Sequence, residues 1–149
     1  MDLRLAAFAE ALDSFSYLVA LDLGELGKTL DARIIDGLEN GKAQKFEYTI
    51  ELGWKAVKLA LRELEGIDEA SPKKVIKAWY LAGQLSEDDY IAFLTAIDDR
   101  NRLSHVYDAD RFNAIIARLP AHAALLKRVL ASLQALRRDD ASRADRLSH

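Results

Sequence analysis

One short run of the sequence, from Asp98 to Tyr107, gathers side chains that can hold a phosphate and move a proton. Arg100 carries a planar guanidinium that can bind a phosphate through two N–H groups, and the imidazole of His105 can accept and donate a proton. Together they suit metal-independent cleavage of a phosphodiester, in which the histidine activates or protonates an oxygen and the arginine stabilises the developing charge. RNA would supply its own 2′-hydroxyl as the nucleophile. We therefore take Arg100 and His105 as candidate catalytic residues, with Asn101 and Ser104 in support.

A helix must position this run. The segment Ser86-Glu87-Asp88-Asp89 resembles a capping box, and the apolar residues that follow keep helical spacing toward the run: Tyr90, Phe93, Leu94 and Ile97. At ~100° per residue, we expect five polar residues to continue the same side of that helix: Arg100, Asn101, Ser104, His105 and Tyr107. Polar groups on a buried or partner-facing side cost desolvation energy unless each finds a hydrogen-bond partner. The cluster therefore indicates either a buried network or a site.

A purely structural interpretation explains the same residues equally well from their spacing. In that interpretation Arg100 pairs with Glu47 or Glu51 across the bundle, and His105 is a neutral core residue. The two glutamates lie one turn apart and could also bind a metal or do acid–base work. However, Glu51 precedes Lys55 by four residues, which is the favourable order for an ion pair. We give Glu47 and Glu51 supporting roles and expect neither a metal ligand nor a cofactor.

The rest of the chain shows helical periodicity. Apolar residues recur at spacings of three and four, which predicts helices over 3–20, 30–41, 42–66, 71–83 and 86–105. Two glycines predict a loop over 23–28, and Pro120 is expected to interrupt a helix that follows Asp108 and to start the last one. No segment alternates like a strand. The predicted fold class is all-α, an antiparallel up-and-down bundle of about five helices.

The length and composition predict one domain over residues 1–138, followed by a polar, frayed tail over 139–149. The absence of cysteine excludes disulfides and thiolate metal sites. Neither a secretion signal nor a run of ~20 apolar residues that could span a membrane is visible. We therefore expect a soluble, cytoplasmic protein.

The formal net charge is −3, which argues against a broad basic surface that grips nucleic acid. Any contact with RNA must be local, and the candidates for a local patch are Lys55, Lys58, Lys73, Lys74 and Lys77. Aromatic residues within apolar stripes are far more often core than base-stacking platforms, so we interpret Phe46, Trp54 and Trp79 as packing residues. His122 and His149 have no evident partners nearby in sequence and are expected at the surface.

Three stretches of the sequence resemble known proteins. Arg100-Asn101 followed by His105 and Tyr107 fits the Arg-x4-His-x-Tyr signature of HEPN toxins of the HepT type. The stretches KFEYTIELGWK over 45–55 and SPKKVI over 71–76 resemble the HEPN-domain family of nucleotidyltransferase substrate-binding proteins. The resemblance covers most of the chain.

This resemblance implies a two-protein module of bacteria and archaea, in which a separately encoded minimal nucleotidyltransferase is the cognate partner of the helical subunit. HepT-type members are metal-independent ribonuclease toxins that are silenced when the partner adenylylates the motif tyrosine, which would be Tyr107 here. Family members pair two motif helices across a cleft, so a homodimer or a dimer of dimers is expected. Neither DNA nor a membrane is an expected partner. The alternative is a non-catalytic adaptor that presents substrate, or Tyr107 itself, to the nucleotidyltransferase.

Overall fold

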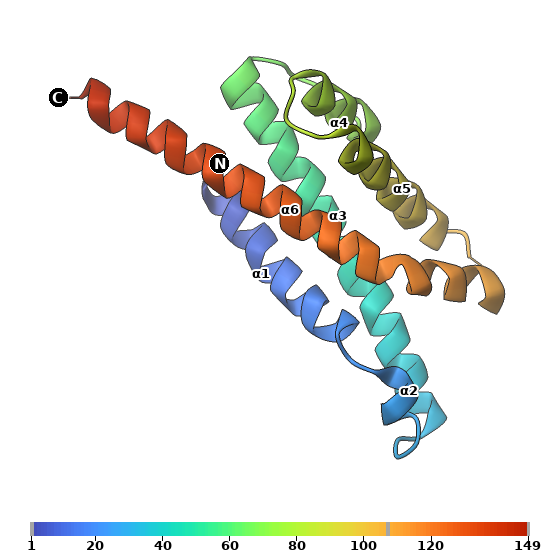
Figure 1. Ribbon diagram of the computed structural model, residues 1–149. Coiled ribbons are helices and arrows are strands. Elements are labelled where there is room, and N and C mark those ends of the chain that lie inside the picture. Colours follow the sequence, from blue (N-terminus) through green and yellow to red (C-terminus); the bar gives the residue numbers. More distant parts are fainter. Residues whose placement is uncertain (1, 107, 149) are drawn as a thin grey trace.

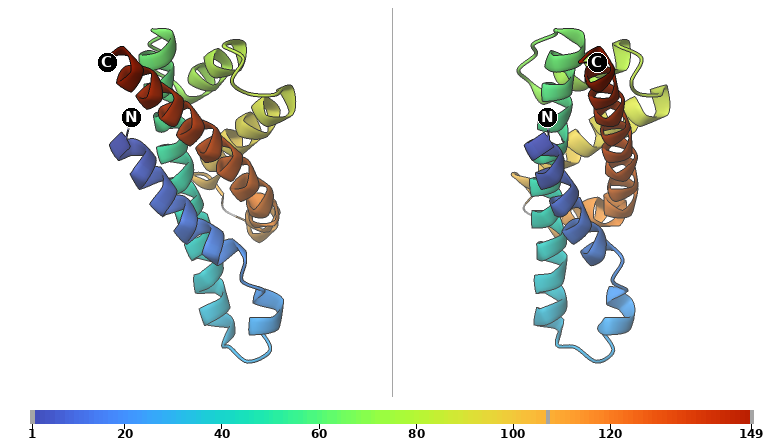
Figure 2. Two further views of the ribbon diagram at one scale, coloured as in Figure 1. Left: turned by 60° about the vertical axis from the view of Figure 1, so that its left-hand side comes forward. Right: turned by 90° about the vertical axis from the view of Figure 1, so that its left-hand side faces the viewer.

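The computed structural model describes residues 2–106 and 108–148, and within them the chain forms six helices and no strands. In chain order the helices are α1 (Asp2–Val19), α2 (Leu23–Leu26), α3 (Ala32–Glu65), α4 (Pro72–Leu81), α5 (Glu87–Leu103) and α6 (Ala109–Leu147) (Figure 1). Helices α1, α3 and α6 pack against one another, while α4 and α5 lie against α3 and against each other (Figures 1 and 2). The predicted all-α fold class is confirmed.

The core lies where α1, α3 and α6 meet. Phe8 and Phe15 of α1 and Phe46 of α3 are fully buried, and the rings of Phe15 and Phe46 are tilted at 44° with centroids 5.8 Å apart. Trp54 and Trp79 are buried as well, so the interpretation of the aromatic residues as packing residues is confirmed. Burying such large apolar surfaces is the main favourable term in folding.

Helix α3 is longer than its sequence predicts. Two helices that meet near Asn40 and Gly41 were expected, but one helix of 34 residues runs from its N-cap at Asp31 to Gly66. Gly66 ends it with a φ of 66°, in the left-handed conformation that favours glycine. A glycine inside a helix costs only about 1 kcal/mol relative to alanine. Packing of α1 along α3 outweighs this cost, so the helix continues through Gly41. The expected loop over 23–28 also contains the single turn α2, which is capped by Asp22.

Helix α6 also continues where a break was expected. Pro120 lies inside one helix of 39 residues rather than between two helices. A proline removes one backbone hydrogen bond and crowds the preceding turn, which bends a helix when the packing around it holds both halves. Leu119 and Ala123 on either side are buried, and the beginning of α6 runs at a clear angle to the rest (Figure 2). The segment expected to be a frayed tail continues α6 to Leu147 with exposed side chains.

Helices α4 and α5 begin where the sequence predicts. Pro72 occupies the first turn of α4, and the chain turns at Gly83, whose φ is 82°. At the start of α5 the hydroxyl of Ser86 accepts a hydrogen bond of 3.1 Å from the backbone N–H of Asp89, as the capping pattern predicts. Within the described residues, none of the helices combines the length and apolar character that a membrane span requires.

Gly53 of α3 lies where side chains of both α1 and α6 pack closely against it. A Cβ atom added there would lie 3.2 Å from Phe8 and 3.2 Å from Leu126, both fully buried. At Gly41, three turns earlier in the same helix, an added Cβ meets only Leu18, at 4.0 Å. The two glycines therefore make a matched pair within one helix.

We expect Gly41→Ala to raise the free energy of unfolding by about 0.5–1 kcal/mol, because alanine is the better helix former. Gly53→Ala should give no gain or a net loss, because overpacking costs about 1–3 kcal/mol. Urea denaturation followed by circular dichroism measures both. An equal gain at the two positions would contradict the close helix approach at Gly53.

Candidate functional site

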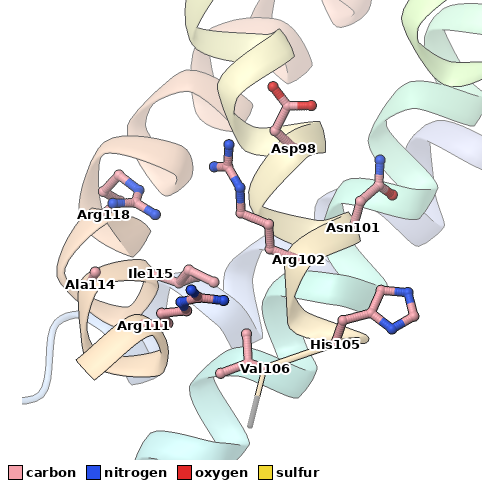
Figure 3. Close-up of a pocket in the computed structure, with 9 residues that line it drawn as sticks. All are labelled: Asp98, Asn101, Arg102, His105, Val106, Arg111, Ala114, Ile115 and Arg118. Carbon is pink, nitrogen blue, oxygen red and sulfur yellow. The ribbon is translucent and has the colours of Figure 1, made fainter. Parts of the chain in front are cut away.

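One face of α5, which we also call the motif helix because it carries Arg100 and Asn101, opens onto a pocket of about 600 Å³. Asp98, Asn101 and Arg102 are spaced i, i+3 and i+4, so they share that face, and His105 joins the lining from the turn just beyond the end of α5. Val106 follows them, and the beginning of α6 completes the lining with Arg111, Ala114, Ile115 and Arg118. We call this the arginine pocket, after its three arginines. Figure 3 shows the arginines gathered where α5 faces α6, with Asn101 and His105 at the opposite edge of the lining.

Arg100 faces a different direction. Its Nη2 lies 3.4 Å from Oε2 of Glu51 on α3, so the expected pairing of Arg100 with one of the two glutamates is confirmed for Glu51. Glu51 also accepts a hydrogen bond of 3.1 Å from the indole N–H of Trp54 and lies 3.5 Å from Nζ of Lys55. Glu47 lines a separate hollow that Leu103 borders. Arg100 thus belongs to the interface between α5 and α3.

The expectation that all the motif residues share one side of the helix is therefore wrong. Arg100 points from α5 toward Glu51 of α3. The helix ends at Leu103, so His105 lies in the turn beyond it and lines the arginine pocket. Ser104 is the exposed C-cap residue of α5 and does not line that pocket. Tyr107 lies outside the described residues.

A buried carboxylate that sequence reasoning overlooked lies beneath the pocket. Asp99 is fully buried, and its two oxygens accept four hydrogen bonds. Arg118 donates two of them, from Nε at 2.7 Å and from Nη2 at 2.8 Å. Arg102 donates one from Nη1 at 3.1 Å, and Nε2 of His122 lies 2.7 Å away. This cluster, which we call the Asp99 network, joins α5 to α6.

His122 is a core residue, so its expected place at the surface is wrong. Its side chain is 5% exposed and its ring stacks on Phe46 at 20°, with centroids 5.1 Å apart. Because an ionised Asp99 carries no proton, the Nε2–H of His122 is the donor to it. A signal was present in the sequence: Asp99 continues the apolar stripe of Ala96 and Leu103, and His122 follows Leu119 by three residues. Both polar side chains can be buried because each has a hydrogen-bond partner on the other helix.

The surroundings set the charges of this network. Burial lowers the pKa of His122, although Asp99 opposes the shift, so the imidazole is neutral near pH 7. For Asp99, burial alone would raise the pKa, but the hydrogen bonds from Arg118 and His122 and the charge of Arg118 together lower the pKa below its ordinary value. Asp99 is therefore a carboxylate held ionised in the interior by a neighbouring guanidinium.

The rim of the pocket carries further ion pairs. Nε of Arg111 lies 3.4 Å from Asp108, and Asp98 pairs with Lys73 of α4. Of the five lysines expected to form a local patch, Lys55 and Lys58 line a separate hollow, together with Arg4 and Arg62. Among the described residues, no group of three or more His, Asp or Glu side chains could hold a metal ion.

Comparisons with known proteins agree with this architecture. A search of curated proteins found no match. A crystal structure from Haemophilus influenzae, described as the fold of a substrate binding domain of a nucleotidyltransferase, superposes with a TM-score of 0.75 and covers 87% of this chain and 98% of that one. At 22% sequence identity, this likeness shows a shared fold.

The family follows from two further matches. A Thermus thermophilus protein of known crystal structure is 33% identical, with a TM-score of 0.72, over 85% of this chain and 98% of that one. The model of the family described as "nucleotidyltransferase substrate binding protein like" matches residues 3–135. The chain belongs to this family.

The buried histidine makes stability depend on pH in a defined direction. Because the folded state lowers the pKa of His122 below 6.5, the unfolded chain takes up this proton first as the pH falls. We expect the free energy of unfolding to decrease as the pH falls below about 6.5, by at most about 1.4 kcal/mol per pH unit from this group. Denaturant titrations at several pH values should show a shallower slope for His122→Gln. An unchanged slope would contradict the neutral, buried state of His122.

Proposed function

We propose that this chain is the helical partner subunit of a minimal nucleotidyltransferase and acts as a HepT-like, metal-independent ribonuclease. The family match and the shared fold support the first part. The motif supports the second, because Asn101 and His105 line a pocket with three arginines. This presence of a proton-transferring group and phosphate-binding groups in the lining of one pocket is the observation that carries the proposal.

The chemistry needs only groups of this kind and RNA itself. The 2′-oxygen attacks the adjacent phosphorus, the bond from phosphorus to the 5′-oxygen breaks, and a 2′,3′-cyclic phosphate and a 5′-hydroxyl result. His105 takes the proton from the 2′-hydroxyl and returns it to the leaving 5′-oxygen. Arg102 and Arg111, whose side chains are 60% and 80% exposed, can stabilise charge on the phosphate oxygens.

Arg100 needs a separate account, since Glu51 holds it at the face toward α3. We propose that the subunit works as a homodimer or a dimer of dimers, in which two-fold symmetry brings two motif helices together. In such an assembly, Arg100 of one chain can complete the site of the other. Its side chain is 38% exposed, so part of the guanidinium can reach a neighbouring chain.

A non-catalytic adaptor is the second candidate function, and the engagement of Arg100 favours it. An arginine that is paired with Glu51 between two helices can serve packing alone. In this case, the pocket face of α5 presents substrate, or Tyr107, to the nucleotidyltransferase and no RNA is cleaved. The two candidates differ in whether the purified chain turns over RNA.

The ribonuclease proposal predicts that His105→Ala and Arg100→Ala each lower RNA cleavage by roughly 100-fold or more, an effect on the order of general acid–base catalysis, while the helical content is unchanged. Cleavage of a labelled RNA without added metal, and growth on induction, are the measurements. Arg128→Ala is the control, because Arg128 pairs with Asp89 outside the pocket. Wild-type protein that never cleaves RNA would favour the adaptor.

The adenylylation proposal concerns Tyr107. Its neighbours Val106 and His105 line the arginine pocket, so an adenylate on the tyrosine would carry negative charge close to the pocket arginines. We expect co-expression with the cognate nucleotidyltransferase and ATP to add one adenylate and to abolish RNA cleavage. Mass spectrometry of wild type and of Tyr107→Phe locates it. Adenylate that is absent, or that persists in the Phe variant, contradicts the assignment.

A further inference from the structure

The arginine pocket has a local charge opposite to that of the chain. Its lining includes three arginines, Arg102, Arg111 and Arg118, and one carboxylate, Asp98, which is already paired with Lys73. Asp99 beneath the pocket and Asp108 beside Arg111 each neutralise one positive charge, which leaves a net positive charge on the three arginines. The formal charge of the whole chain is −3, so this concentration of guanidinium groups is a local feature. Such a hollow attracts anions.

The arginines keep hydrogen-bond donors for a ligand. A guanidinium has five N–H groups. Arg118 uses its Nε and Nη2 on Asp99, Arg102 uses only Nη1, and Arg111 approaches Asp108 through Nε. The side chains are 41%, 60% and 80% exposed, respectively, so the remaining donors reach solvent.

The rest of the lining suits the apolar part of a nucleotide. Val106, Ala114 and Ile115 contribute aliphatic surface between the charged groups. A volume of about 600 Å³ falls in the range of pockets that hold small molecules. Phosphate oxygens on the arginines and a base or ribose on the aliphatic surface would use both kinds of lining.

We propose that the arginine pocket binds a phosphate group of a nucleotide or an RNA strand, and that Asp99 is the positioning residue of this site. Its carboxylate holds the Arg118 side chain by a two-pronged contact and draws Arg102 to the same point. The fixed guanidinium groups therefore meet the ligand without further ordering, which lowers the entropic cost of binding. This inference rests on the proposed function for its choice of nucleotide ligands.

Positioning and simple electrostatics predict opposite effects for Asp99→Asn. Loss of one negative charge makes the pocket more positive, which by long-range attraction alone would tighten anion binding. Loss of the carboxylate also frees Arg118 and Arg102 from their shared anchor, which weakens binding if orientation matters. The sign of the change therefore separates a positioning residue from a nearby charge.

The experiment titrates the full chain with 5′-AMP, with adenosine, and with an oligoribonucleotide whose 2′-oxygens are methylated so that it cannot be cleaved. Isothermal calorimetry measures the affinities. We expect AMP or the oligonucleotide to bind, adenosine to bind about tenfold more weakly or not at all, and Arg111→Gln and Asp99→Asn to lower the affinity about tenfold. Preference for AMP identifies a mononucleotide as the source of the phosphate, and preference for the oligonucleotide identifies an RNA strand.

Two further variants make the positioning role testable. Asp89→Asn removes the other carboxylate that ties α5 to α6, through Arg128, and should leave the affinity unchanged. Arg118→Lys keeps the charge but cannot make the two-pronged contact, so it should weaken binding even if Asp99→Asn does not fold. Equal binding of adenosine and AMP, no binding of either phosphate ligand, or full affinity in Arg118→Lys would overturn the proposal.

The result is separable from the ribonuclease proposal. If the variants change phosphate affinity as expected but the protein never cleaves RNA, the pocket proposal is supported and the ribonuclease proposal is overturned. Cleavage that is unaffected by Arg111→Gln and Asp99→Asn supports the nuclease and overturns the pocket.

Discussion

The Asp99 carboxylate is the interaction on which the candidate site depends. A fully buried charge is costly unless it is paired and its lone pairs are satisfied, and here one arginine fork, a second arginine and a neutral histidine satisfy them. Removing one partner from such a buried group costs about 3–5 kcal/mol. His122 connects the Asp99 network to the hydrophobic core, because its ring stacks on Phe46. The pocket wall and the hydrophobic core are therefore one connected structure.

The motif helix divides its functional side chains between two faces. Arg100 faces α3 and is held by Glu51, whereas Asn101 and His105 face the pocket. Neither face alone combines the motif arginine with the motif histidine. Within one chain the guanidinium groups that line the same pocket as His105 come from outside the recognised motif, from α6 and from Arg102.

Local signals predicted local structure well. The cap at Ser86, the proline at the start of α4 and the apolar stripe of α5 all depend on residues within one or two turns, and each was predicted correctly. The breaks expected at Gly41 and Pro120 were wrong because helix preferences of about 1–3 kcal/mol yield to the packing of whole helices. These errors concern tertiary contacts, which a window of sequence does not contain.

The candidate site also depends on tertiary contacts, only some of which could be predicted from the sequence. The pairing of Arg100 with Glu51 could be anticipated, because two candidate carboxylates lay on a recognisable polar stripe. The Asp99 network could not, because its members are 19 and 23 residues apart in sequence and belong to two helices. The position of His122 three residues after Leu119 was a sign of burial, but the sequence around it gave no indication that its partner is Asp99.

The bend of α6 at Pro120 gives its two parts separate tasks. The part after the bend contributes Leu126, Val129 and Leu133 to the packing with α1 and α3, while the part before it contributes Arg111, Ala114 and other pocket residues. Substitutions in the first part can alter what the pocket accepts without disturbing the core, provided that its buried anchors Ile115 and Leu119 are kept. One helix thus carries a pocket wall and a core-packing segment whose side chains can change independently of each other.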